Sequence, residues 1–258
     1  MPSNNPRSRF RSSAQIRCAP ALIWTLAVVP NPNGAIMTPP NLAEKFRRFI
    51  HQAEFPCVGA KSALAKGTLH VLVARDIRSN WDDSRIYDGI SHVVREYQAD
   101  GALFQSFAVV FEGPLDMDER TFETFLWARA ESLTNKDTWL GQSLDERVSS
   151  DPGDPHFSLS FGEEAFFIVG LHPRASRPAR RFERPVLVFN LHDQFEQLRE
   201  QGRYERMRAK IIERDVALAG SPNPMLARHG TISEARQYSG RNVAEPAWIC
   251  PFRPVERI

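Results

Sequence analysis

A cysteine stands four residues before a lysine in the segment Phe55-Pro56-Cys57-Val58-Gly59-Ala60-Lys61. A thiol near a cation has a lowered pKa, and the resulting thiolate is reactive or binds metal. Free cysteines are more often buried, inert hydrophobes. Cys57 is therefore a candidate catalytic or pocket residue, with a packing role as the alternative.

A histidine at the end of an apolar run forms the second group. His172 follows the run 165–171 and precedes Pro173. A histidine held in this way is well placed to ligate a metal or haem iron. Guanidinium groups match carboxylates and phosphates, so the arginines that follow favour an anion or cofactor site over a solvated basic loop. These arginines are Arg174, Arg177, Arg180, Arg181 and Arg184.

The third group lies near the C-terminus, in Gln237-Tyr238-Ser239-Gly240-Arg241 and Trp248-Ile249-Cys250-Pro251-Phe252. Arg241 adds another guanidinium that could hold a cofactor. Cys250 could ligate a metal as thiolate or approach Cys57. The alternative is an aromatic clasp that ties down the end of the chain.

The remaining histidines predict less. His192 lies near a predicted helix start and is an alternative ligand, whereas His51, His70, His92 and His229 have the pattern of ordinary face or surface positions. No pair has HxH or HxxxH spacing, so a non-haem metal would need ligands from distant segments. Haem needs only one axial ligand from the protein. Dinucleotide, phosphate-loop, zinc-protease and CxxC motifs are absent.

The elements that must position these residues follow from hydrophobic periodicity. Segment 55–67 breaks the pattern at Pro56, Gly59 and Gly67, and residues 221–258 are mostly irregular. Helices are predicted over 41–55, 80–99, 117–133 and 193–220, the last interrupted near Gly202. Strands are predicted over 68–74, 104–113, 157–161, 165–171 and 185–190.

Strands and helices do not alternate regularly, which favours an α+β fold with a mixed sheet covered by helices and a long irregular C-terminal segment. No flexible linker divides residues 37–258, so we expect one domain there. Residues 1–36 carry four arginines and no Asp, Glu or Lys. This stretch has features of a targeting peptide, but we interpret it as a disordered or non-native extension before Met37.

Composition excludes several classes of protein. The 258 residues carry a formal net charge of +2, with 25% charged and 42% hydrophobic residues. The near-neutral charge argues against nucleic-acid binding, and no apolar run reaches the roughly 18 residues of a membrane span. Three cysteines suit a reducing compartment, so we expect a cytoplasmic protein without a membrane partner. A homodimer is left open.

Several unusual motifs occur in an order that resembles the YqcI/YcgG family, also called FPC-motif proteins. The resemblance covers roughly residues 40–253. The matching stretches are FPCVGAKSAL (55–64), FSLSFGEEAFFIVGLHPRASRPARRF (157–182), VFNLHDQFEQLR (188–199), ARQYSGR (235–241) and CPF (250–252).

The resemblance implies an activity. Characterised members are haem-dependent N-oxygenases that hydroxylate the guanidine nitrogen of arginine or related compounds. We therefore expect haem b, O₂ or peroxide as oxidant, a nitrogen-rich small-molecule substrate and an electron donor of unspecified identity.

The working model assigns roles on this basis. His172 is the proximal haem ligand, with Cys250 or His192 as alternatives, and Cys57 lies in the pocket wall. A cationic substrate needs a carboxylate to hold it, for which Glu112 and Glu163 are candidates. The residues expected to bind the cofactor are His172, Arg177, Arg180, Arg181 and Arg241. The rival hypotheses are a non-haem anion-binding protein and a redox protein that uses Cys57 and Cys250.

Overall fold

Residues 41–227, 230–243 and 248–253 are described by the computed structural model, and the predicted extension at 1–36 lies outside them. They contain a five-stranded sheet in the order β1-β2-β5-β4-β3. β1 and β2 are parallel, and the other neighbouring strands are antiparallel. The α+β fold class with a mixed sheet is confirmed. The strands are β1 (Leu69–Asp76), β2 (Ser106–Gly113), β3 (Leu159–Phe161), β4 (Glu164–Leu171) and β5 (Val186–Leu191).

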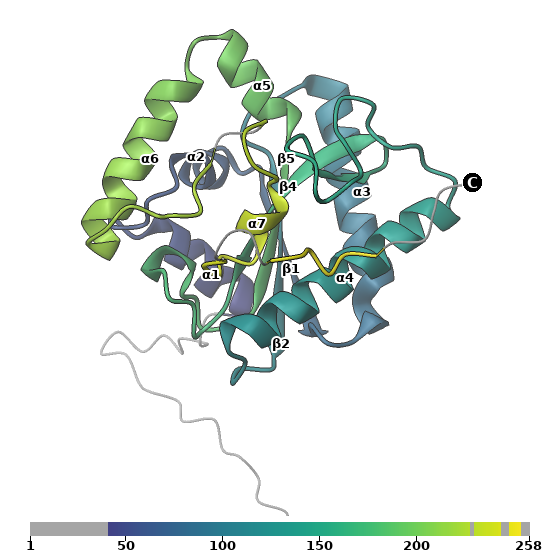
Figure 1. Ribbon diagram of the computed structural model, residues 1–258, viewed down its shortest axis with the longest axis horizontal. Coiled ribbons are helices and arrows are strands. Elements are labelled where there is room, and N and C mark those ends of the chain that lie inside the picture. Colours follow the sequence, from purple (N-terminus) through teal and green to yellow (C-terminus); the bar gives the residue numbers. More distant parts are fainter. Residues whose placement is uncertain (1–40, 228–229, 244–247, 254–258) are drawn as a thin grey trace, which may run out of the picture. The chain divides into compact units, whose positions relative to one another are not determined.

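Helices cover both faces of the sheet (Figure 1). The helix predicted from residue 117 begins at Glu119 and is capped by Asp118, whose side chain accepts a hydrogen bond from the backbone N–H of Thr121 at 2.7 Å. It runs to Trp139, beyond its predicted end. On one face lie α3 (Asp83–Asp100) and α4 (Glu119–Trp139), and on the other lie α1 (Leu42–His51) and α2 (Val58–Lys66).

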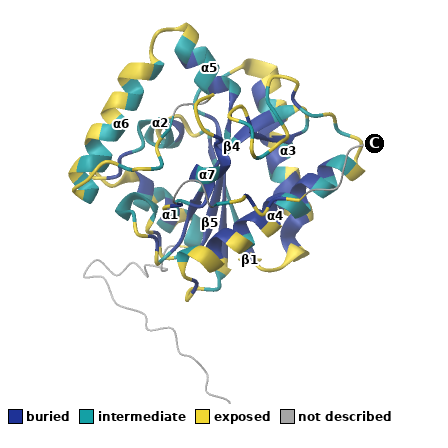
Figure 2. Ribbon diagram, viewed as in Figure 1, coloured by how far each residue is buried: buried dark blue, intermediate teal, exposed yellow. Residues whose placement is uncertain are grey.

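The alternation of side chains along β2 divides the core into two clusters. Phe107 and Phe111 pack with α3 and α4, whereas Ala108 and Val110 pack with α1 and α2. Successive residues of a strand point to opposite faces, and both faces are covered here. Figure 2 shows the strands as the most buried part of the molecule.

The prediction for segment 55–67 is wrong, because α2 (Val58–Lys66) is a helix. Pro56 precedes the helix, where it removes no helical hydrogen bond. Gly59 lies in the first turn, and Gly67 ends the helix in the left-handed region at φ 75°. These residues mark the ends of a short helix, whereas their types predicted an interruption of regular structure.

The chain after β5 forms two helices with a break at Gly202 (φ 63°), as predicted. These are α5 (Asp193–Glu200) and α6 (Tyr204–Ala219). The described part of the segment after residue 220 is irregular apart from α7 (Ala235–Tyr238). β3 pairs with β4 only as far as Phe166. α7 packs against β4, and Tyr238 donates its hydroxyl to the Phe166 carbonyl at 3.2 Å.

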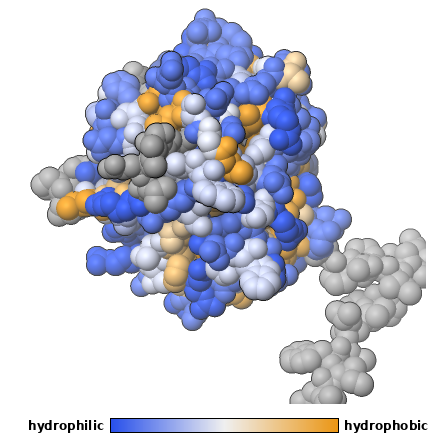
Figure 3. Space-filling model, turned by 90° about the vertical axis from the view of Figure 1, so that its right-hand side faces the viewer, coloured by the Kyte–Doolittle hydropathy of each residue, from blue (hydrophilic) through white to orange (hydrophobic). Residues whose placement is uncertain are grey.

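The surface carries few large apolar side chains. On the face drawn in Figure 3, small apolar groups are scattered among hydrophilic residues. Trp81, Trp139 and Ile249 are the most exposed of the large hydrophobic residues. None of the helices in the described ranges combines the length and apolar character that a bilayer crossing requires.

Candidate functional site

His172 is the first residue after β4 and is 1% exposed. Its backbone N–H donates to the Arg180 carbonyl at 3.1 Å, and its own carbonyl accepts from the Ala175 N–H at 3.2 Å. The imidazole stacks on the ring of Phe122 in α4, with 4.5 Å between ring centroids and 22° between planes. Strand, loop and helix therefore fix this side chain together.

The His172 imidazole is uncharged at neutral pH. Burial lowers its pKa to about 4, and the nearby charge of Glu119 opposes this shift without cancelling it. Its Nδ1 atom is enclosed and has no hydrogen-bond partner among the residues that the structure describes. A buried ring nitrogen in this state retains its capacity to bind hydrogen or metal.

This low pKa predicts acid sensitivity of the haem-free protein. Between about pH 6.5 and about pH 4 the unfolded chain protonates His172 and the folded chain does not. The unfolded state thus binds more protons, so the free energy of unfolding decreases by about 3 kcal/mol as the pH is lowered through this window. Urea unfolding at several pH values should show this loss in wild type and its absence in His172→Leu. Identical pH profiles would contradict the assignment.

Arg180 ends the short 3₁₀ turn η2 (Pro178–Arg180) and connects three segments. Its Nη1 donates to the Gly170 carbonyl at 3.2 Å and to the Tyr238 carbonyl at 2.9 Å. Burial lowers the pKa of its guanidinium to about 10, still well above neutrality. Arg180 forms no ion pair with any described carboxylate. The charge of Asp215 raises the pKa of Arg180, but the Asp215 carboxylate itself pairs with Arg177.

The positive charge of Arg180 acts on Cys57. Cys57 caps α2, where its Sγ accepts the N–H of Ala60 at 3.4 Å. Burial raises the pKa of the thiol, and the charge of Arg180 opposes this rise without overcoming it. Cys57 is therefore a neutral thiol at pH 7, and its proximity to Lys61 does not activate it: the Lys61 Nζ donates to the carbonyl oxygens of Gln52 and Ala53.

Three of the sequence motifs thus meet at one place. We call the group of Cys57, His172, Arg180, Tyr238 and Gly240 the Arg180 junction. Gly240 belongs to it because a Cβ at this position would lie 2.5 Å from Cδ of Arg180. Residues far apart in the sequence meet here through the side chain and backbone of Arg180.

Gly240→Ala should disturb the junction in two ways. Its φ of +82° is strained for any residue with a Cβ, which costs about 1–2 kcal/mol. The added methyl also displaces Arg180. Gly220→Ala is the matched control, because its φ is +74° and nothing lies within 4 Å of the added Cβ. Urea unfolding should show a larger loss of unfolding free energy for Gly240→Ala than for Gly220→Ala. Equal losses would mean that the Arg180 side chain moves aside without a cost in stability.

The other predicted arginines are held by protein groups. Arg177 pairs with Asp215 of α6 and donates to the Ser221 carbonyl at 3.0 Å. Arg181 donates to the carbonyls of Ala175 and Ser176 at 3.0 and 3.1 Å. Arg241 forms a two-point ion pair with Glu123 of α4, at 2.5 and 3.0 Å. Arg180 and Arg181 each donate to two backbone carbonyls and pair with no described carboxylate, but Arg181 is exposed whereas Arg180 is partly buried.

The two predicted substrate acids lie at opposite ends of the sheet. β2 and β4 both run antiparallel to β5, so their C-terminal ends lie at the same end of the sheet. Glu112, exposed near the end of β2, is therefore at the same end of the sheet as His172. Glu163 is exposed in the turn before β4, a strand length of roughly 25 Å from His172. The structure does not bring Glu163 to the Arg180 junction.

The alternative ligands are also buried. Cys250 belongs to the core cluster of α3 and α4, while Cys57 packs against the cluster on the other face of the sheet. Both are free thiols, and burial raises the pKa of Cys250 to about 12. The His192 ring is 8% exposed, with its Nε2 3.7 Å from Glu234 Oε1.

Sequence reasoning missed Glu123, which holds the C-terminal motif in place. Besides Arg241, it accepts hydrogen bonds from Ser239 Oγ at 3.0 Å and Trp248 Nε1 at 3.4 Å. A signal was present: Glu123 shares a helical face with Trp127 and Ala130, so an acid interrupts an apolar stripe. A buried acid requires a cation from elsewhere.

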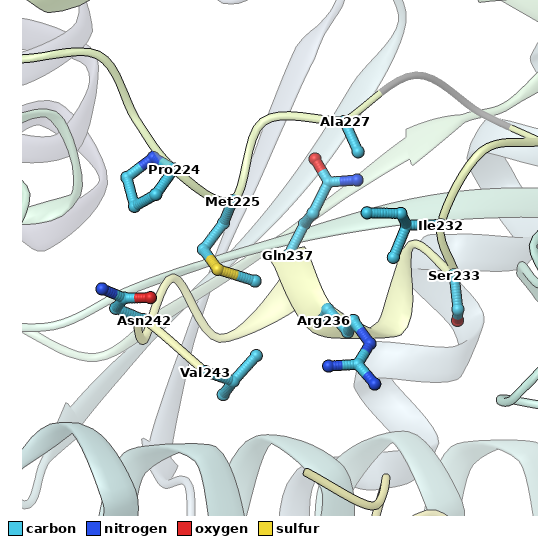
Figure 4. Close-up of a pocket in the computed structure, with 9 residues that line it drawn as sticks. All are labelled: Pro224, Met225, Ala227, Ile232, Ser233, Arg236, Gln237, Asn242 and Val243. Atoms are coloured by element: carbon cyan, nitrogen blue, oxygen red, sulfur yellow. The ribbon is translucent and has the colours of Figure 1, made fainter. Parts of the chain in front are cut away.

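Two cavities lie near these motifs. One of about 190 Å³ lies between the segment near Met225, α7 and Val243 (Figure 4). Its lining combines Gln237 and Arg236 of α7 with apolar side chains such as that of Met225. Another, of about 450 Å³, begins at Val58, the residue after Cys57, and is bordered by cationic side chains from the start of α6. Among the described residues, no histidine or cysteine lines either cavity.

Comparison with known proteins supports the resemblance seen in the motifs. No curated protein and no solved structure matches the chain significantly. The model of the YqcI/YcgG family matches residues 46–253, which include every member of the Arg180 junction. The chain therefore belongs to the YqcI/YcgG family.

Proposed function

We propose that this protein is a haem-dependent N-oxygenase that hydroxylates a guanidine or amine nitrogen of an arginine-like small molecule. The observation that carries the proposal is Arg180, a cation without a described acid partner beside an uncharged buried histidine. Arg180 is partly buried, and cations withdrawn from water in proteins are normally paired. Arg180 therefore suits an anionic group, such as a carboxylate of haem.

The donor chemistry of His172 fits a haem ligand. Metal ligands must be deprotonated, and His172 is uncharged with one unpartnered ring nitrogen. Cys57 and Cys250 are protonated at neutral pH because burial raises their pKa values, which disfavours thiolate ligation. His172 is thus the better ligand candidate of the three.

When bound, haem supplies the activation of oxygen at its iron. In the reaction class, one atom of O₂ enters an N–H bond and the other leaves as water, with two electrons from a donor and two protons. Arg180 would hold a carboxylate, and Phe122 fixes the plane of the His172 ring and excludes water from one side. Glu112, at the same end of the sheet as His172, is the remaining candidate to orient a cationic substrate.

The test begins with absorption spectra of protein supplied with haem. Wild type should give a Soret band, and His172→Ala should alter its position or abolish it. Arg180→Gln should weaken haem affinity about tenfold or more, since a charge-assisted bond contributes about 1.5–3 kcal/mol. Arg177→Gln is the control, because its partner is Asp215.

Activity is tested with the haem-loaded protein. Arginine and simple guanidines, an electron donor and O₂, or peroxide alone, should give the N-hydroxylated product by mass spectrometry. A haem-loaded protein whose spectrum is unchanged in His172→Ala removes that ligand assignment. A protein that takes up no haem removes the proposed function.

A second candidate function is binding of a small anion, which the larger cavity favours. Arg203, Arg206 and Lys210 border this cavity, Lys210 pairs with Glu213, and none of the described residues that line the cavity is acidic. Haem-free protein titrated with citrate or phosphate in a calorimeter should then bind one anion, and Arg206→Glu should abolish binding. Anion binding without haem uptake would favour this function over the first.

A further inference from the structure

Two histidines and a glutamate meet where the edge strand β1 packs against α3. His70 Nε2 lies 2.8 Å from Glu96 Oε2, and His92 Nε2 lies 3.3 Å from Glu96 Oε1. The imidazole rings are 5.3 Å apart at 85°. Ligand atoms of all three residues lie within 4.8 Å of one another. We infer that His70, His92 and Glu96 form a binding site for a divalent transition-metal ion of the zinc class.

The secondary structure brings the three together. His92 and Glu96 are four residues apart in α3, so they share one face of that helix. In β1, Leu72 and Ala74 pack in the cluster of α3 and α4, and His70 has the same parity and faces the same way. Histidine spacing did not predict this site, because one ligand comes from a strand and two from a helix.

The distances suit coordination. With metal–nitrogen and metal–oxygen bonds of about 2.0–2.2 Å, tetrahedral ligand atoms lie about 3.4 Å from one another. The two contacts with Glu96, at 2.8 and 3.3 Å, are slightly shorter than this spacing, and all the ligand atoms lie within 4.8 Å of one another, so small side-chain rotations suffice. Without metal, both Nε2 atoms lie at ion-pair distance from the Glu96 carboxylate. A metal replaces these contacts when each imidazole carries its single proton on Nδ1 and presents the Nε2 lone pair.

The ligand types select the metal. Two imidazoles and one carboxylate suit Zn²⁺, Cu²⁺, Ni²⁺ or Co²⁺, whereas Mg²⁺ and Ca²⁺ prefer oxygen ligands. Three protein ligands leave at least one coordination position to water, as in open zinc sites. The side chains of His70, His92 and Glu96 are 30%, 53% and 40% exposed, so an ion reaches them from solvent.

This site is separate from the Arg180 junction in composition and in its contacts. It joins the edge strand to a helix of one face of the sheet, so a bound ion ties β1 to α3. Binding to the folded chain alone stabilises it by mass action. Metal occupancy should therefore raise the melting temperature whether or not the protein holds haem.

The experiment uses the full chain and ZnCl₂ alone, followed by isothermal calorimetry and thermal unfolding. Wild type should bind one zinc ion per chain at this site and melt at a higher temperature with zinc. Glu96→Gln retains a hydrogen-bond acceptor but loses the charge, and it should lower the affinity at least about tenfold. His92→Ala removes a ligand and should lower it further. Both positions are at the surface, so both variants should fold.

His156→Ala is the matched control, since His156 is an exposed histidine beside a carboxylate, with its Nδ1 3.3 Å from Asp154 Oδ1. It should bind zinc like wild type, and MgCl₂ should give no binding. The inference is overturned if wild type binds no zinc, or if His92→Ala and Glu96→Gln bind it with the stoichiometry and affinity of wild type.

Discussion

Replacing Arg241 with alanine is expected to lower the free energy of unfolding by about 3–5 kcal/mol, because it leaves a buried carboxylate without its cation. The Glu123 side chain is 8% exposed, and Arg241 supplies two of its hydrogen bonds, from Nε and Nη2. The remaining donors, Ser239 and Trp248, are neutral and do not balance the charge. Urea unfolding of protein prepared without haem measures this loss.

Two further variants test whether the loss of stability comes from the unpaired carboxylate. Arg181→Ala removes hydrogen bonds to backbone carbonyls and no ion pair, so it should lose much less stability. Adding Glu123→Gln to Arg241→Ala removes the unpaired charge and should recover part of the loss. If Arg241→Ala instead leaves stability unchanged and weakens haem binding, Arg241 is a cofactor residue, as its motif first indicated.

The regular elements could be predicted because their hydrophobic periods were long. The eight residues of β2 are buried almost throughout, and the apolar stripe of α3 begins at Ile86 and continues to Tyr97. α2 could not be predicted in this way. It has nine residues, and only Ala63 among them is buried, so its period is weak. The cap at Cys57 and the left-handed Gly67 define it instead.

Individual residues of the candidate site could be selected from the sequence, but the contacts between them could not be predicted. His172 at a strand end and a cluster of arginines could be read from the chain. Which arginine stays available to a ligand depends on partners from other segments: Asp215 of α6 takes Arg177, and Glu123 of α4 takes Arg241. Spacing along one loop contains no information on these long-range pairs. The same holds for His70 and His92, whose pattern indicated ordinary surface positions.

The role of Phe122 connects this packing to the chemistry of His172. Phe122 is fully buried, and its ring also contacts the position of Gly170, where a Cβ would lie 2.7 Å from Phe122 Cε1. The absence of a side chain at Gly170 lets α4 approach β4 closely. This close approach is what encloses the imidazole two residues later and keeps its pKa low.

Phe122→Ala should therefore lower the free energy of unfolding at pH 7 by about 3–5 kcal/mol, the usual effect of removing a buried phenylalanine ring. It should also admit water to His172 and move its pKa from about 4 back toward 6.5, so that less stability is lost on acidification. Unfolding in urea between pH 7 and about pH 4 measures both effects in one variant. The titration of His172 accounts for a loss of about 3 kcal/mol in wild type over this range, and this contribution should be clearly smaller in Phe122→Ala.

Leu126→Ala separates the stacking contact from general loss of packing. Leu126 is fully buried one helical turn away and contacts the same Gly170 position, with its Cδ1 2.8 Å from the added Cβ. Its removal should cost about 2–5 kcal/mol. It does not stack on the imidazole, so its pH dependence should match wild type. If both variants show the same pH dependence, Phe122 does not set the titration of His172, and the enclosure of the imidazole has another origin.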